Sequence, residues 1–151
     1  MKYNGTIYRP PIEANTFLLP ITEGCTHNSC TFCNMYQGIP FRMLSIPEVE
    51  DYLAETKQSY GKYSERMERV YLVGADPFAL SSKNLLERID LIKRYLPNVK
   101  TITMYTRTDN IASKSDEDLK ALISAVHTKS NKRLTTFGAF TMAGRTALSS
   151  M

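Results

Sequence analysis

The chain has 151 residues, of which 42% are hydrophobic, enough for one ordinary domain with a packed core or for part of a larger one. The formal net charge of +4 does not indicate a nucleic-acid-binding face, because residues 1–126 carry 15 Lys and Arg against 15 Asp and Glu. The whole excess comes from four basic residues of the last 25, which contain no acid. No stretch approaches the roughly 20 apolar residues that span a bilayer.

The N-terminal residues have no apolar segment of the kind that a secretory signal contains. We therefore expect a protein of the reducing cytoplasm with no membrane partner, in which thiols stay reduced or bind metal.

Three short segments are predicted to be β-strands. Turn-forming residues bound the first segment, although Pro20 weakens the prediction of a strand there. A continuous apolar run stopped by glycine makes the second typical of a strand buried on both faces, and the third is rich in β-branched residues. The segments are residues 15–22, 69–74 and 99–106.

A helix is predicted after each strand. Ser45 begins the first with a Ser-x-x-Glu capping box, Ser81 or Ser82 begins the second, and Ser115 begins the third as Ser-x-x-Asp. Repeated strand–helix order implies parallel strands joined by right-handed crossovers. Residues 1–126 are therefore expected to form an α/β fold, half of a barrel or of a doubly wound sheet.

The last 25 residues, 127–151, have a different character. They contain eight Ser and Thr, scattered glycines and no clean period. Residues 133–140 give weak support for a fourth strand, and the segment as a whole is expected to be a poorly ordered tail.

The only three cysteines, Cys25, Cys30 and Cys33, lie within nine consecutive positions with the spacing C-x4-C-x2-C. They belong to a long aperiodic segment after the first strand, at the sheet edge where α/β proteins place their ligands. Four interpretations compete: a disulfide with one thiol left over, clustered core cysteines, a zinc site completed by His27, and an iron–sulfur cluster. The residues favour the cluster, since its inorganic core binds soft thiolates.

The number of cysteines is informative. An electron-carrying cubane cluster usually takes four cysteines, and three leave one iron without a protein ligand. An open coordination position is typical of a metal site that binds and transforms a substrate.

These motifs resemble those of the radical S-adenosylmethionine (radical SAM) enzymes, especially the bacterial group related to elongator-type and oxygen-independent coproporphyrinogen oxidase-like members. The resemblance covers residues 9 to about 126. The family's motif is C-x3-C-x-Φ-C, and Phe32 stands at the aromatic position, whereas four residues here separate the first two cysteines. The segments that carry the resemblance are RPPIEA, EGCTHNSCTFCNMY with FR at 41–42, GADPF and LPNVKTITMYTR.

The resemblance implies a 4Fe-4S cluster on Cys25, Cys30 and Cys33, with S-adenosylmethionine at the open iron as the source of a 5′-deoxyadenosyl radical. Phe32 is then expected near the cofactor's adenine, and Gly74 and Asp76 near its amino group. From the residues alone, Gly74 and Asp76 fit equally well a turn glycine and a loop-bending aspartate.

The family's chemistry also requires an electron donor and a substrate, neither of which the sequence identifies. A barrel of this family has six β/α units. Only three can be recognised in this sequence, so the chain is expected to be a truncated member of the family. A zinc-organised binding module and an inactive fragment remain the alternatives.

Overall fold

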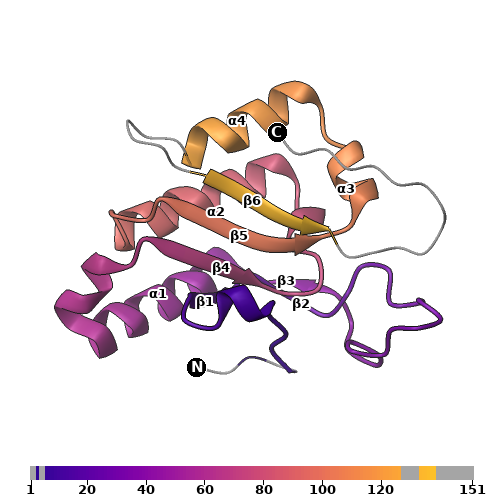
Figure 1. The fold of residues 1–151 in the computed structure, drawn as a ribbon, viewed down its shortest axis with the longest axis horizontal. Coiled ribbons are helices and arrows are strands. Elements are labelled where there is room, and N and C mark those ends of the chain that lie inside the picture. Colours follow the sequence, from indigo (N-terminus) through magenta and orange to yellow (C-terminus); the bar gives the residue numbers. More distant parts are fainter. Residues whose placement is uncertain (1–2, 4–5, 127–132, 139–151) are drawn as a thin grey trace.

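The computed structural model describes residues 3, 6–126 and 133–138 and has a mixed α/β architecture (Figure 1). Its main sheet has four parallel strands in the order β1-β4-β5-β6. The mixed α/β class with parallel strands, predicted from the sequence, is confirmed. The strands are β1 (Phe17–Pro20), β4 (Arg69–Val73), β5 (Thr101–Thr106) and β6 (Arg133–Gly138).

The predicted helices begin at their predicted caps. The amide of Ser45 donates to Glu48 Oε2 at 2.7 Å, and the amide of Glu48 donates to Ser45 Oγ at 3.4 Å, which completes the capping box. Ser81 and Ser115 accept hydrogen bonds in the same way at the starts of the next two predicted helices. The helices are α1 (Ile46–Tyr60), α2 (Ser82–Tyr95) and α4 (Asp116–Val126).

Several short elements were not predicted from the sequence. A two-stranded antiparallel sheet pairs β2 (Thr22–Glu23) with β3 (Arg42–Met43). A one-turn helix, α3 (Thr108–Ala112), follows β5 directly. Three 3₁₀ turns complete the description: η1 (Pro11–Glu13), η2 (Gly61–Arg66) and η3 (Pro77–Ala79).

The hydrophobic core lies between the sheet and its three long helices. Alternate strand residues such as Leu19, Leu72 and Ile102 pack against Leu53 of α1 and Ile89 of α2. Since neighbouring strand residues point to opposite faces, Tyr71, Thr103 and Tyr105 belong to the other face of the sheet. No α-helix of the described residues packs on that face, which we call the helix-free face, and it carries the buried carboxylate of Glu13 from the 3₁₀ turn η1.

Glu13 is fully buried and is held by charge-assisted hydrogen bonds. Arg69 at the start of β4 donates to its two oxygens at 2.9 and 2.5 Å, and Thr16 Oγ1 donates at 2.6 Å. The hydrogen bond from Arg69 is the main reason that the pKa of Glu13 lies below its ordinary value. These bonds fasten η1 across the amino end of the sheet.

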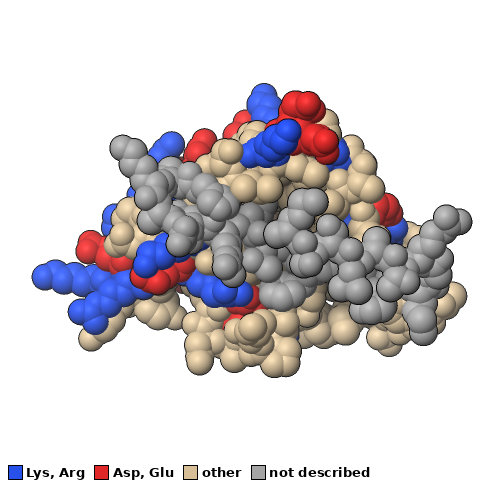
Figure 2. Space-filling model, turned by 45° about the horizontal axis from the view of Figure 1, so that its top comes forward, with Lys and Arg blue, Asp and Glu red and all other residues tan. Residues whose placement is uncertain are grey.

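Residues 133–138 form β6 beside β5, while the rest of the tail predicted for 127–151 lies outside the described residues. Within the described part of the chain, no helix is long and apolar enough to cross a bilayer. On the face drawn in Figure 2, blue Lys and Arg groups lie among red Asp and Glu groups over the coloured surface.

Candidate metal and cofactor site

The cysteine segment, residues 24–41, runs from β2 to β3. The antiparallel pairing holds its two ends together, and the amide of Leu44 donates to Ile21 O at 3.0 Å just beyond the pair. Gly24 has a φ of +66°, and a Cβ there would overlap the carbonyl oxygens of Ile39 and Pro40. Only glycine therefore fits where the outgoing and returning arms of the segment meet.

All three cysteines are free thiols, so the disulfide interpretation finds no support. Cys25 and Cys30 are half-buried and Cys33 is exposed, which is not the burial of packed core cysteines. In the described part of the chain, no three His, Cys, Asp or Glu side chains are grouped as metal ligands. The structure thus brings the cysteines onto one segment without gathering their sulfurs into a ligand set.

His27, the fourth ligand of the zinc alternative, is exposed, and its Nε2 lies 3.1 Å from Ser29 Oγ. Phe32, expected near an adenine ring, is 66% exposed. Met35, Phe41 and Met43 are also exposed on the segment and the strand that ends it. The segment that carries the thiols therefore also exposes several large apolar side chains.

Asp76 connects the cysteine segment to the carboxyl ends of β4 and β5. It is fully buried, and its Oδ2 accepts hydrogen bonds from Thr26 Oγ1 at 3.0 Å and from Asn110 Nδ2 of α3. Its Oδ1 accepts from the amide of Arg107 at 3.2 Å, directly after β5. Three segments that are distant in sequence therefore meet at one carboxylate.

Burial raises the pKa of Asp76, and the hydrogen bonds from Arg107, Thr26 and Asn110 oppose that rise. Both carboxylate oxygens already have donors. The geometry therefore supports the structural role for Asp76 that the residues themselves suggested, and its contact with a cofactor amino group stays a prediction.

Gly74 is placed where the end of β4 passes β2. It has a φ of +139°, and a Cβ there would overlap the Oγ1 of Thr22. Thr22 Oγ1 is buried without a hydrogen-bond partner among the described residues. Glycine is required at 74 by backbone conformation and by this close approach, and its predicted contact with a cofactor is untested.

The sequence analysis missed a group of tyrosines on the helix-free face. The hydroxyls of Tyr3, Tyr36 and Tyr71 are buried, and none has a hydrogen-bond partner among the described residues. Tyr71 packs edge-on against Tyr105, with ring centroids 5.9 Å apart. The sequence did contain a signal for part of this group. Tyr71 and Tyr105 alternate with the apolar strand residues that face the helices, which places both rings on the opposite face of the sheet.

The electrostatic surroundings link this tyrosine group to the cysteine segment. Burial raises the pKa of Tyr36, and Tyr3, Tyr8 and the Cys25 thiol raise it further. Burial likewise raises the pKa of Tyr3 to about 12. These phenols therefore stay protonated at neutral pH.

Arg107 places a cation at the same end of the sheet. Its guanidinium donates to both oxygens of Asp109, at 3.0 and 2.5 Å, and these bonds are the main reason that its pKa is raised. Asp76 and Cys25 also raise it through their charges.

No family model, curated protein or solved structure matches the chain.

Proposed function

We propose that the protein is a radical SAM iron–sulfur protein, built as part of a (β/α) barrel, in which Cys25, Cys30 and Cys33 hold a 4Fe-4S cluster. One observation carries the proposal: three free thiols share a segment at the carboxyl ends of parallel strands, tied through Thr26 to Asp76. Ligand sites of α/β sheets and barrels lie at this edge.

The donor set fits such a cluster chemically. Reduced thiols are the ligands that iron–sulfur clusters take, and three of them leave one iron open for a cofactor. The segment is anchored at its ends by β2 and β3, and Cys33 is exposed, so metal can reach it. Loading requires the segment to bring the sulfurs together, which the short spacings of four and two residues permit.

When bound, the cluster and S-adenosylmethionine supply the one-electron chemistry by which such enzymes abstract hydrogen atoms. The protein's own residues position and shield. The buried carboxylate of Asp76 holds Thr26, the residue after Cys25, at the end of β4. An unidentified reductant would supply the electron.

Anaerobic reconstitution tests the proposal. The protein should turn brown and hold about four iron and four sulfide per chain. Replacing Cys25, Cys30 or Cys33 by alanine should each lower that content. Ser29→Ala, a change on the same exposed segment, is the matched control and should leave it unchanged.

The contrary results are equally definite. One tightly bound zinc with no sulfide, weakened by His27→Ala, would establish the zinc-organised module instead. Full iron and sulfide in any single Cys→Ala variant would overturn the ligand assignment. With the cluster loaded and reduced, we expect formation of 5′-deoxyadenosine from S-adenosylmethionine.

A further inference from the structure

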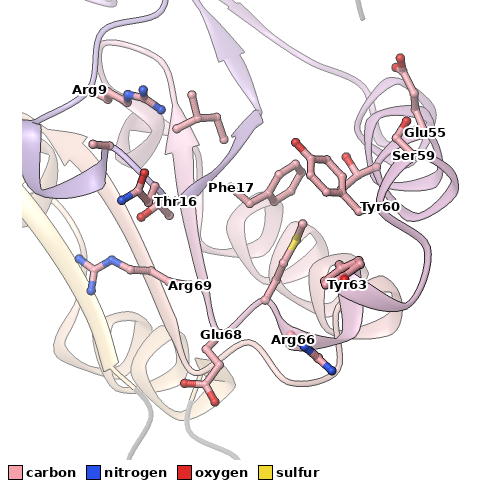
Figure 3. A pocket seen from close by; sticks show the side chains of 15 residues that line it. Arg9, Thr16, Phe17, Glu55, Ser59, Tyr60, Tyr63, Arg66, Glu68 and Arg69 are labelled. Carbon is pink, nitrogen blue, oxygen red and sulfur yellow. The ribbon is translucent and has the colours of Figure 1, made fainter.

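A large open cavity lies at the amino end of the sheet, opposite the strand ends that carry the cysteine segment (Figure 3). Its volume is about 700 Å³, within the range of pockets that hold small molecules. Phe17 of β1 and Arg69 of β4 line the cavity together with the end of α1 and η2. Nothing in the proposed cysteine chemistry uses this end of the sheet.

One side of the cavity is aromatic. Figure 3 shows the ring of Phe17 next to that of Tyr60, with Tyr63 on the same side of the cavity. Tyr60 is 55% exposed and Tyr63 is 70% exposed, which is high for large aromatic side chains. The exposed rings provide surfaces on which a planar group can stack.

The cavity also contains two arginines that are not held in ion pairs within the described part of the chain. Arg9 and Arg66 line it, and neither forms an ion pair with any residue that the structure describes. Arg66 lies over the Tyr63 ring, 5.4 Å from its centroid. In contrast, Arg69 is neutralised by Glu13, and Glu68 is paired with Lys100.

The other polar groups limit the size and charge of a ligand. The carboxylates of Glu55 and Glu68 also line the cavity and would repel an extended polyanion such as nucleic acid. A compact ligand can meet Arg9 or Arg66 while it avoids both acids. Guanidinium groups pair well with phosphate and carboxylate, since their fork of donors matches two acceptor oxygens.

We propose that this cavity binds a small planar aromatic anion, with its ring stacked on the Tyr60 and Tyr63 side and its phosphate or carboxylate on an arginine. The site is independent of the cysteine segment. It is therefore expected in protein without metal.

Fluorescence and calorimetric titration of the full chain with 1-naphthyl phosphate test the site, with 1-naphthol and inorganic phosphate as the two half-ligands. The intact probe should bind more tightly than either half. Tyr63→Ala should weaken binding about three- to tenfold through lost stacking, and Arg9→Ala about tenfold through the lost charged hydrogen bonds. S-adenosylmethionine should not compete, which separates this site from the proposed cofactor site.

Lys62→Ala is the control, because Lys62 is exposed in the same turn and does not line the cavity. It should bind the probe like the unmodified protein, and circular dichroism should show all variants folded. Equal affinity for inorganic phosphate and the aromatic probe would overturn the proposal, as would unchanged binding in folded Tyr63→Ala and Arg9→Ala variants. Failure to bind the probe at all would overturn it too.

Discussion

Thr26 Oγ1 donates a hydrogen bond of 3.0 Å to Asp76 Oδ2 across 50 residues of sequence. This bond fastens the residue that follows Cys25 to the end of β4. Because Asp76 also accepts from the amide of Arg107, one buried carboxylate sets the position of the cysteine segment relative to two strands. The site and the sheet are therefore coupled, and damage to this contact should affect both.

Removing the Thr26 hydroxyl should weaken that coupling. Thr26→Ala should lower the free energy of unfolding by roughly 1 kcal/mol, since one hydrogen bond to a carboxylate that keeps two other donors is lost. Urea denaturation measures the change. Thr31→Ala, an exposed threonine on the same segment, is the control and should stay within about 0.5 kcal/mol of the original. An equal loss in both variants would contradict a special role for the Thr26 bond.

Asp76→Asn should be more destabilising and its cost should depend on pH. Burial raises the folded-state pKa of Asp76 above its unfolded value. The stability that this group contributes is thus fully present below about pH 4, the unfolded pKa, and is lost as pH rises through the folded pKa. The difference in unfolding free energy between the original and Asp76→Asn should therefore shrink as pH rises above about 4. A difference that grows would show that the ionised form is the stabilised one.

Gly74 and Gly38 form a matched pair for testing close approach. Both have positive φ, but a Cβ at 74 would overlap Thr22 Oγ1, whereas a Cβ at 38 meets nothing within 4 Å. Gly38→Ala should cost about 1 kcal/mol through backbone strain alone, and Gly74→Ala should cost clearly more. Adding Thr22→Ala to Gly74→Ala should recover part of the loss, measured as a double-mutant cycle. Equal costs at the two glycines would refute the contact between β4 and β2.

The contribution of Glu48 to the free energy of unfolding should depend on pH in the opposite sense to that of Asp76. Hydrogen bonds from Arg42 first, and from the backbone and side chain of Ser45, lower its pKa to about 2. Its contribution is therefore present above the unfolded pKa, about 4.3, and is lost as pH falls toward 2. The stability difference between the original and Glu48→Gln, followed by thermal melts, should vanish in this window. A constant difference down to pH 2 would argue against the ionised carboxylate of Glu48, held by Arg42 and Ser45, as its source.

The parts of the fold that depend on local sequence were predictable. The capping box at Ser45 and the cap hydrogen bond at Ser115 involve residues three apart, and the apolar periods of the helices are continuous in sequence. The strand of residues 69–74 was visible because burial on both faces leaves an unbroken apolar run. These signals do not depend on the rest of the chain.

The missed features arise from contacts between distant residues. The β2–β3 pair has two residues in each strand, too few to produce a period, and it exists because Thr22 meets Met43. Asp76 gains its donors from residues 31, 34 and 50 positions away, a relation that no spacing encodes. The cysteines were identified by spacing alone, whereas the tyrosines beside them become a group only when the sheet forms.

Tyr71→Phe should be neutral or stabilising, which is unusual for a fully buried residue. The Tyr71 hydroxyl is buried without a hydrogen-bond partner among the described residues, so its removal ends a desolvation penalty while the ring keeps its packing against Tyr105. Chemical denaturation should show an unfolding free energy unchanged or raised by up to about 1 kcal/mol. Tyr95→Phe is the matched control, because its hydroxyl donates to Glu50 Oε1 at 2.8 Å, and its loss should destabilise the protein. If Tyr71→Phe instead destabilises the protein, the hydroxyl must be satisfied by a buried water. In that case the helix-free face is a hydrated part of the core.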